Sequence, residues 1–517
     1  MFDPLATPLR EWRAALGDEH VLADGRAYEQ CTFAHDNQVN AVLRPGSVAE
    51  VQALVRIAAE YRVPLYPISR GRNWGYGSRA PTADAVVVDL GRLDEITAYD
   101  EDLACVTVQP GVTQQQLVDF LAERGGRHWA DTTSVSPDSS VLGNIVERGH
   151  GLTPYADHVD CVGSLEVVLG DGQKLETGHA RFGASGVAGL DRFTAGPSLQ
   201  GLFTQSSLGI VTAVKLWLMP APEASSALLF DPATDEELLA LIPVLRQLRL
   251  QGTIASGPRF ANVFRGLMFG EYPWDRVEPG GVLRKETALE LARDRGRGAW
   301  RVSCAVHGPR REVEARAQTV FEAVAPLLST PPIVFDPSDP SSSGATADNL
   351  EVLSTLLTGG LMPGGAASIR TYWRKKARPE GLPDPDRDRC GVLWLAPVTP
   401  FRAADVRVVQ SLVEEVLPRH GFEPDLSMYC LRARALHYHI SIMYDRDRPG
   451  ADAAAKAAHD ELLWRFLEHG YPPHRLGLQS MVAMDGSSDV HATVLNSLKR
   501  ALDPAQILAP RRYHPKP

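Results

Sequence analysis

Three glycines lie close together in one stretch of the chain, PISRGRNWGYGSRAP at residues 67–81. Glycine at 71, 75 and 77 lets the backbone turn its N–H groups toward one point and approach a ligand closely. Such a loop suits a diphosphate or another anion. It is neither a Walker loop, which ends in Gly-Lys-Ser/Thr, nor a dinucleotide fingerprint, which leads into a helix. As a bare pattern, a glycine-rich surface turn explains it equally well.

The sequence on either side of this loop alternates between strand and helix patterns. Residues 41–44 predict a short strand, and Ser47 is expected to cap a helix over VAEVQALVRIAAEY, whose apolar residues recur at helical spacing. Residues 63–69 predict a buried strand before the loop. After the loop, AVVVDL at 85–90 is a β-branched run typical of a strand covered on both faces. We therefore expect a strand–helix–strand–loop–strand unit.

Further strands and helices are expected in both halves of the chain. The stretch MPAPEASS at 219–226 is typical of a domain linker, and the Pro/Ser-rich residues 330–346 are typical of a surface loop. Helices are expected over DEELLALIPVLRQL, REVEARAQTVFEAVAPLL and AADVRVVQSLVEEVLP. Strands are expected at 104–108, 164–170, 209–220, 391–398, 426–431 and 438–444.

The composition is that of an ordinary globular protein. The 517 residues carry 53 Lys and Arg against 63 Asp and Glu, a net charge of −10, and 44% of them are hydrophobic. This excludes a disordered chain, a fibrous repeat and a small disulfide scaffold. The length suggests about two to four domains of roughly 150 residues each. The acidic balance argues against non-specific nucleic-acid binding, which depends on basic surfaces.

The cysteines and the apolar runs predict a cytoplasmic protein. The six cysteines lie far apart without a Cys-x-x-Cys pair, so we expect free thiols and no zinc site. The N-terminus shows no secretory signal, and no run reaches the roughly 20 apolar residues of a membrane span. We therefore expect no membrane association and no bound metal.

Two further loops are rich in small residues. They are SSVLGNIVERGHGLTPYADHV at 139–159 and GLFTQSSLGIVT at 201–212, which comes just before an expected strand. Each of them alone could be a turn. Three such loops next to strands, in one mixed half of the chain, suggest that they bind one extended, phosphorylated ligand.

Together, these segments resemble the vanillyl-alcohol oxidase and p-cresol methylhydroxylase family of flavoproteins. Five motifs occur in the family's order and approximate spacing: PISRGRNWGYGSRAP, SVLGNIVERGHGLTPYADH, LFTQSSLGIVTAVKLWLMP, GYPPHRLGLQSM and LDPAQILAP. The resemblance runs from about residue 30 to the C-terminus. It implies an α+β, two-domain FAD-binding fold of the p-cresol methylhydroxylase type, with an α+β cap domain over the isoalloxazine. Residues 1–218 and 481–517 would form the FAD-binding domain, and residues 219–480 the cap domain.

The resemblance implies that the small-residue loops hold FAD, the first of them through backbone amides that bind its diphosphate. The implied cofactor-binding residues are Ser69, Arg70, Gly71, Arg72, Asn73, Gly75, Tyr76, Gly77, Ser140, Gly143, Asn144, Ser206, Gly209, Ile210 and Val211. Many members attach FAD covalently through a His or Tyr, but the matching position here is Val392. Cys390, two residues earlier, is expected to be an inert buried thiol. We therefore expect non-covalent FAD.

Members of this family take a hydride from the carbon para to a phenol hydroxyl, after which water adds or a proton leaves. Electrons then pass to O₂ or to an electron-acceptor protein. A phenolate loses hydride most easily, so the site needs cationic and hydrogen-bonding groups around the phenol oxygen. The matching residues are Tyr76, Arg475 and His474, with histidine replacing the family's tyrosine. The alternative for Arg475 is a surface arginine.

One departure from the family concerns the acid that its oxidases carry beside flavin N5, just ahead of SVLGN. This chain has Ser134 or Val135 at that position, with Asp131 and Asp138 on either side. The usual acid is therefore lost or displaced, which weakens proton handling after hydride transfer.

A histidine pair could replace that acid as a base. In ALHYHISIMY at 435–444, strand alternation places His437 and His439 on one face and Tyr438 on the other. By resemblance, the histidine face lines the substrate cavity together with Trp394 and Met428. The alternative is a pair of partly buried strand histidines bonded to the backbone.

Three functions therefore remain open. The first is oxidation of a small para-substituted phenol or related aromatic. The second is a divergent member of the family that catalyses oxidative cyclisation, dehydrogenation or hydroxylation of a secondary metabolite. The third is a flavin-binding protein that has lost catalysis. By analogy with the family, we expect a homodimer or a larger homo-oligomer.

Overall fold

The first sheet of the fold contains the strands on either side of the glycine loop. The computed structural model describes residues 4–133, 136–183, 186–279, 281–337, 356–357, 369–377, 381–484 and 489–514. The strand order of the first sheet is β1 (Val21–Leu22), β2 (Val39–Leu43), β4 (Ala85–Asp89) and β3 (Leu65–Ile68). β2 and β3 both pair parallel to β4. Ser47 Oγ accepts a hydrogen bond from Glu50 N and caps α2 (Val48–Tyr61). The predicted strand–helix–strand–loop–strand unit is confirmed.

The second sheet is antiparallel. Its order is β5 (Ile96–Asp100), β6 (Cys105–Val108), β10 (Ile210–Trp217), β8 (Val162–Val168) and β9 (Lys174–Glu176). α3 (Gln114–Glu123) and α4 (Val141–Val146) share an apolar core with β6, β8 and β10. β7 (His128–Trp129) pairs separately with β11 (Met219–Pro220).

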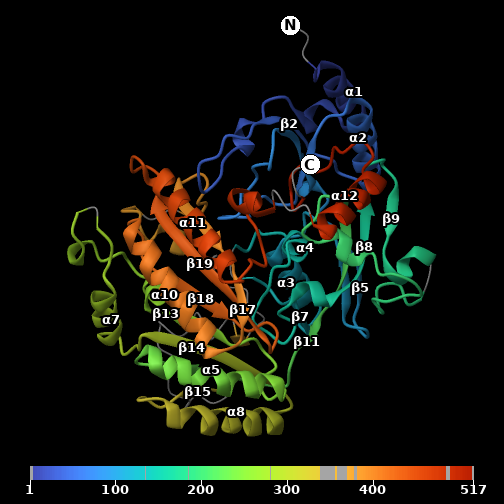
Figure 1. The fold of residues 1–517 in the computed structure, drawn as a ribbon. Helices are drawn as coiled ribbons and strands as arrows, with labels where there is room; N and C mark the ends of the chain where they lie inside the picture. Colours follow the sequence, from blue (N-terminus) through green and yellow to red (C-terminus); the bar gives the residue numbers. More distant parts are fainter. Residues whose placement is uncertain are drawn as a thin grey trace.

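The third sheet has eight described strands, all within residues 224–445. Its main path is β15 (Ile333–Phe335), β12 (Ala224–Phe230), β14 (Trp300–Gly308), β13 (Arg259–Asn262), β18 (Asp425–Tyr429), β19 (Ala435–Asp445) and β16 (Cys390–Leu395), while β17 (Val398–Pro400) also pairs with β19. Four helices share the largest apolar core with this sheet (Figure 1): α5 (Asp235–Leu250), α8 (Arg310–Val324), α10 (Ala403–Arg419) and α11 (Ala451–Glu468).

The stretch at 219–226 differs from the predicted free linker. β11 takes its first two residues, and β12 begins at Ala224 with all of its residues buried. β12 pairs with β14 along its whole length, so ladder bonds and burial outweigh the proline-rich composition. Most of the predicted loop at 330–346 lies outside the described residues, although Ile333–Phe335 pairs with β12.

The last described segment returns to the first sheet. α12 (Val490–Leu502) ends at Asp503, whose carboxylate accepts hydrogen bonds from the backbone N–H groups of Ile507 and Leu508. Leu508 then forms an isolated bridge with Leu65 of β3. Segments from the two ends of the chain therefore lie together, red beside blue in Figure 1.

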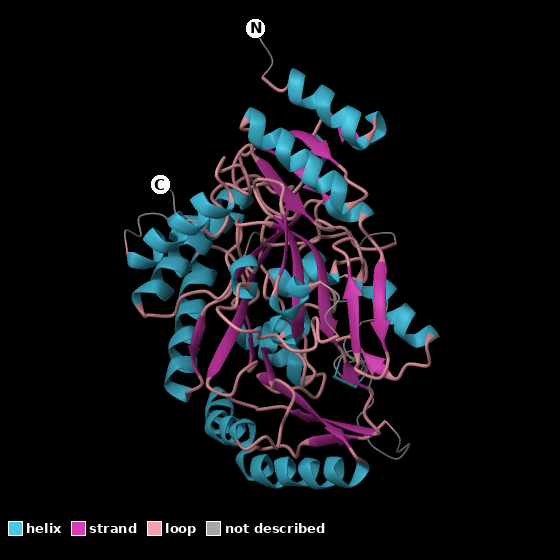
Figure 2. Cartoon of the chain, turned by 90° about the vertical axis from the view of Figure 1, so that its right-hand side faces the viewer, coloured by secondary structure: helices cyan, strands magenta, loops and turns pink. Residues whose placement is uncertain are grey.

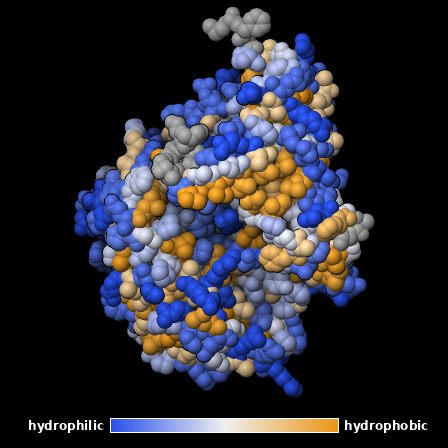
Figure 3. Space-filling model, turned by 45° about the vertical axis from the view of Figure 1, so that its right-hand side comes forward, coloured by the Kyte–Doolittle hydropathy of each residue, from blue (hydrophilic) through white to orange (hydrophobic). Residues whose placement is uncertain are grey.

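α1 (Ala6–Leu16) and α2 lie together at one end of the molecule (Figure 2). One face is hollowed, with hydrophilic and hydrophobic side chains around the hollow (Figure 3). Among the described helices, none combines the length and the apolar character that crossing a membrane requires. All six cysteines are buried free thiols, as predicted.

Candidate active site

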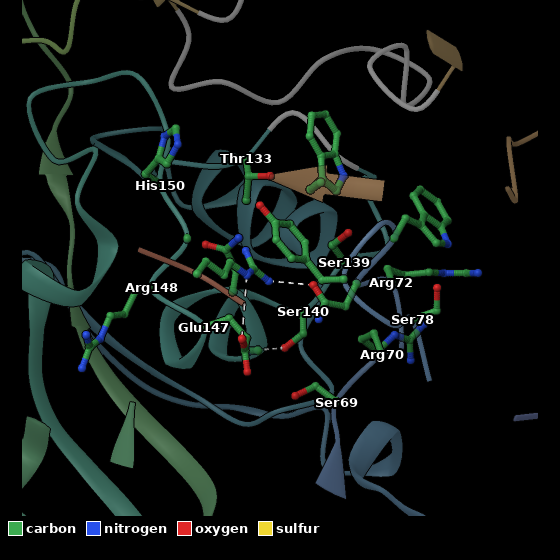
Figure 4. Close-up of a pocket in the computed structure, with 18 of the residues that line it drawn as sticks. Ser69, Arg70, Arg72, Ser78, Thr133, Ser139, Ser140, Glu147, Arg148 and His150 are labelled. Atoms are coloured by element: carbon green, nitrogen blue, oxygen red, sulfur yellow. Dashed lines mark hydrogen bonds and ion pairs between the residues drawn. The ribbon is translucent and has the colours of Figure 1, made fainter. Parts of the chain in front are cut away.

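A cavity of about 280 Å³ lies where the glycine loop and the 139–152 segment meet the third sheet. Figure 4 shows residues of the loop and of the α4 region around it. The second half of the chain contributes Arg259, Phe269, Arg370, Thr371, Val392, Trp394, Tyr429, His439, His474, Arg475 and Arg512. Two of the three predicted small-residue loops therefore meet at one site.

Gly75 brings the glycine loop into contact with the third sheet. Its carbonyl accepts hydrogen bonds from Trp394 N (3.2 Å) and Gln479 Nε2 (3.1 Å), and its N–H donates to Thr32 Oγ1 (2.9 Å). Its φ of 78° lies in the left-handed region, and a Cβ there would overlap the Trp394 ring. Only glycine allows this close approach.

Most of the predicted cofactor-binding residues line the cavity. These are Ser69, Arg70, Gly71, Arg72, Asn73, Tyr76, Ser140, Gly143 and Asn144. Gly75 and Gly77 belong to the same loop but lie outside the lining. Ion pairs join Arg72 to Asp138 (2.8 Å) and Asp384 (2.7 Å), so this arginine braces the loop against the rest of the protein.

The third small-residue loop lies away from the cavity. Ile210 and Val211 begin β10, and their side chains are buried in apolar cores. Gly209 packs against Val167 and Phe203, and Ser206 Oγ accepts a hydrogen bond from Leu208 N. The structure therefore does not bring Ser206, Gly209, Ile210 and Val211 to the cavity, because this segment is committed to the strand that follows it.

Tyr76, Arg475 and His474 lie together at the cavity, as predicted from the resemblance. The Arg475 guanidinium carbon lies 4.3 Å from the centroid of the Tyr76 ring. Arg475 Nη2 donates to Asn73 Oδ1 at 2.6 Å, which fixes the side chain against the glycine loop. His474 Nδ1 lies 3.0 Å from Ala396 O, so this nitrogen is assigned as the protonated donor. Burial raises the pKa of Tyr76 to about 12 despite Arg475, so its hydroxyl stays protonated.

Glu147 is a carboxylate that the sequence did not indicate (Figure 4). It balances the positive charges of Arg475 and Arg512. It forms an ion pair with Arg512, accepts a hydrogen bond from the Tyr513 hydroxyl and lies 3.7 Å from Arg475 Nε. Burial opposes its ionisation, but Arg512 and Arg475 outweigh burial and lower its pKa. Glu147 sits in the VERG part of a recognised motif, yet no spacing rule connects it to a residue 365 positions away.

Four histidines gather where the 139–152 segment meets the third sheet. His439 stacks on His150 with ring centroids 4.9 Å apart and Nε2 atoms 3.3 Å apart. His474 lies 4.8 Å from His437 and 6.1 Å from His439, centroid to centroid. The predicted shared face of His437 and His439 is confirmed, but only His439 lines the cavity. His150 was not predicted as a site residue.

All four imidazoles are held neutral near pH 7. Burial lowers the pKa of His150 and of His437 to about 4. Burial and the neighbouring histidines lower the pKa of His439 and His474 well below the usual range. Among the described residues, no group of three or more potential ligands could hold a metal ion.

Only one of the two residues predicted to bind substrate lies at the cavity. Trp394 lines the cavity, with its ring 5.9 Å from that of His439. Met428 is fully buried in the core on the opposite face of the sheet, so its predicted place in the cavity is wrong. The physical reason is strand register: Met428 pairs with Tyr438, while its neighbour Tyr429 faces the histidines and lines the cavity.

Comparison with known proteins places this geometry in a family. A family model described as "FAD binding domain" matches residues 39–178. The chain is 38% identical to 1'-carboxy-chondrochloren decarboxylase of Chondromyces crocatus, over 99% of this chain and 97% of that protein. It is 28% identical to the 4-cresol dehydrogenase [hydroxylating] flavoprotein subunit of Pseudomonas putida, over 98% of this chain and 94% of that protein. The chain belongs to the p-cresol methylhydroxylase family of FAD-dependent enzymes.

Solved structures of this family share the fold over nearly the whole chain. p-Cresol methylhydroxylase with substrate bound superposes with a TM-score of 0.89 and 26% identity, covering 99% of this chain and 96% of that one. The 4-ethylphenol oxidase of Gulosibacter chungangensis, in complex with isoeugenol, gives 0.89 and 25%, covering 99% and 97%. The predicted fold class and the FAD cofactor are confirmed.

The cavity of this p-cresol methylhydroxylase family member fits FAD. Ser139 Oγ is buried in the cavity wall and has no hydrogen-bond partner among the described residues, so a ligand acceptor would complete it. At Gly143, a Cβ would come within 3.0 Å of Ser69 Oγ, so the walls stay close only because both residues are small. The loop residues 69–73, with Ser139, Ser140 and Asn144, would hold the cofactor, which accepts the hydride in enzymes of this family.

The positions that bear on covalent attachment are both buried. Val392 is fully buried and lines the cavity beside Gly75, and its side chain has no nucleophile. Cys390 is also fully buried, and burial raises the pKa of its thiol to about 12, so it is inert.

The acids that flank the expected N5 position are held by other residues. Asp131 accepts a hydrogen bond from Thr153 N at 2.8 Å and lies 2.9 Å from His158 Nε2. Asp138 is bound to Arg72. Ser134 and Val135 lie outside the described residues. Of the two histidines on β19, His439 lines the cavity and His437 does not.

Proposed function

We propose that this FAD-dependent enzyme takes a hydride from the benzylic carbon of a para-substituted phenol. The observation that carries the proposal is the grouping of Tyr76, Arg475 and His474 at one cavity. These residues come from positions about 400 apart in the chain, and they present a hydroxyl donor, a guanidinium and a neutral imidazole.

The chemistry of hydride loss explains this grouping. As hydride leaves, the electrons of the phenolate oxygen move into the ring, and a quinone methide forms. Arg475 and the Tyr76 hydroxyl stabilise the phenolate, which is the form that gives up hydride most readily. Asn73 and Glu147 orient Arg475, so little reorganisation is needed when the charge shifts. Water then adds to the quinone methide, or a proton leaves its side chain.

Further features of the proposal follow from the family and from the site. FAD is bound without a covalent link, because Val392 and Cys390 offer no attachment. The reduced flavin passes its electrons to O₂ or to an electron-acceptor protein. The working enzyme is a homodimer or a larger homo-oligomer located in the cytoplasm.

Anaerobic flavin reduction tests the proposal. Mixing the holoenzyme with 4-ethylphenol in a stopped-flow instrument should bleach the flavin absorbance. Arg475→Ala should slow this step by about 10²-fold or more, because a transition-state charge partner is lost. Arg475→Lys should recover part of the rate, and the exposed Arg311→Ala should leave it unchanged. An unchanged rate in Arg475→Ala would contradict the assigned role, and no bleaching by any 4-alkylphenol would refute the proposed reaction.

A second candidate is oxidative decarboxylation of a phenol with an acidic side chain. The 38% identity over nearly the full length to a protein named as a decarboxylase favours it. After hydride loss from the benzylic carbon, the bond from the next carbon to the carboxylate would break. Its electron pair would form the new C=C and restore the aromatic ring, and CO₂ would leave. Mass spectrometry of the product distinguishes this outcome from addition of water.

A further inference from the structure

Two arginines line the cavity beside the histidines, apart from the Tyr76–Arg475 group. Arg259 is on β13 and lies directly opposite Tyr429 in the ladder with β18. Arg370 also lines the cavity, with its guanidinium carbon 5.1 Å from the centroid of the Phe269 ring. The Tyr429 ring lies 4.9 Å from His439 and 4.7 Å from His150, centroid to centroid. We call Arg259, Arg370 and Tyr429 the cap cluster.

Among the described residues, no carboxylate neutralises the Arg259 guanidinium. Its side chain makes no hydrogen bond or ion pair with a described residue, and its Nε is buried without a partner. By contrast, the nearby Arg265 is paired with Asp425 at 2.9 Å, and both are almost fully buried. Arg259 is half-buried at the cavity wall with its Nε shielded from water, so an anionic ligand in the cavity would supply the missing counter-charge.

The pKa of the Tyr429 hydroxyl indicates the sign of the electrostatic potential at the cap cluster. Among the thirteen tyrosines, all of which lie in the described part of the chain, Tyr429 has a pKa that is lowered from its usual value. Burial would raise this pKa, as it does for Tyr76 and Tyr438, but Arg259, Arg265 and Arg370 outweigh it. A phenol hydroxyl that ionises more easily despite burial indicates a net positive site.

His439 connects the two ends of the substrate site. Its ring is 6.1 Å from His474 and 4.9 Å from Tyr429. A phenol held at Tyr76 and Arg475 would therefore direct its para substituent past His439 toward the cap cluster. Arg259 and Phe269 also line a neighbouring cavity of about 310 Å³, so a longer substituent has room beyond the cluster.

We propose that the cap cluster binds a carboxylate on the side chain of the phenol substrate, through Arg259 and Arg370 with the Tyr429 hydroxyl as a further donor. The proposal rests on the proposed function for the placing of the phenol. A carboxylate suits this site because a guanidinium can bind both of its oxygens. The substrate class is then a para-hydroxyphenyl acid, and Arg259 is the residue that selects the acid over a neutral analogue.

Binding of matched ligands to the holoenzyme tests this assignment without turnover. 4-Hydroxycinnamate and 4-hydroxycinnamamide have no sp³ benzylic hydrogen and differ only in acid against amide. Isothermal titration should show tighter binding of the acid to the wild-type protein. Arg259→Met should weaken binding of the acid by about 10- to 100-fold and leave binding of the amide nearly unchanged. Arg259→Lys should restore part of the difference.

The controls distinguish the loss of the Arg259 charge from a loss of folding and from a failure of the proposed reaction. Arg295→Met removes an exposed arginine from the wall of the neighbouring cavity and should leave both affinities unchanged. The visible flavin spectrum and the melting temperature check that Arg259→Met and Arg259→Lys are folded. Equal weakening of acid and amide in Arg259→Met, or no preference for the acid in the wild type, would overturn the carboxylate site.

Flavin reduction by 4-ethylphenol, which has no carboxylate, is measured in parallel. In the wild-type holoenzyme it tests the phenol oxidation separately from the binding of the acid. Loss of the acid preference in Arg259→Met supports the carboxylate site even where 4-ethylphenol fails to bleach the flavin. Bleaching by 4-ethylphenol without an acid preference supports the phenol oxidation alone and overturns the carboxylate site.

Discussion

Acid should destabilise this protein through its buried histidines, and His437 gives the sharpest case. Burial lowers the pKa of His437 from 6.5 to about 4. Between these values the unfolded chain binds a proton that the folded chain does not, so stability falls as the pH falls. The contribution of the neutral, buried His437 imidazole to the free energy of unfolding is fully retained above pH 6.5. It is reduced by about 2 kcal/mol at pH 5 and by about 3 kcal/mol below pH 4.

The structure offers a conservative variant for the test. His437 packs against His474, its Nδ1 has no partner among the described residues, and it does not line the cavity. His437→Gln keeps a polar side chain of similar reach but cannot titrate. For a unit of about 250 residues, 1 kcal/mol shifts the melting temperature by about 2 °C. The wild type should therefore lose about 4 °C more than His437→Gln between pH 8 and pH 5.

Thermal melts at pH 8, 7, 6 and 5, followed by circular dichroism, measure this difference. The exposed His491→Gln serves as the matched control and should follow the wild type at every pH. Parallel pH dependence of the wild type and His437→Gln would refute the argument, because the buried imidazole would then contribute nothing to acid sensitivity.

Two further outcomes are expected. Gly75→Ala should destabilise the protein by about 2–4 kcal/mol and weaken FAD retention, because its φ of 78° is strained for alanine and the new Cβ overlaps Trp394. Gly125→Ala, at φ 90° with open space around it, isolates the strain and should cost only about 1 kcal/mol; equal melting temperatures for the two variants would remove the argument for close approach. Acid precipitation should leave the yellow flavin in the supernatant, and a yellow pellet would show a covalent link.

The sequence predicts the local architecture around the glycine loop well because each signal there is local. Ser47 precedes an apolar helical pattern, and the capping bond forms where expected. The loop residues face one cavity because their glycines sit between two strands of one sheet. The meeting of Tyr76 with Arg475 has no local signal, and only the resemblance to a family predicts it.

The failures at the site come from information that the sequence does not carry. Alternation shows that Ser427 and Tyr429 share a face, but it does not show which face of β18 meets His439. The register settles this, and it places Met428 in the core. Glu147 and His150 were missed because their partners are hundreds of residues away, so no spacing within one element indicates them.

The ion pair between Glu147 and Arg512 also affects when the cofactor cavity is completed during synthesis. Glu147 lies in the α4 region, among segments made early, yet its counter-charge is made 365 residues later. Domains generally fold as they emerge, N-terminal parts first. Until Arg512 joins, the nascent chain must keep Glu147 hydrated or protonated. The cofactor cavity is therefore completed late, and fragments that stop before residue 512 should fold their first sheets but retain flavin poorly.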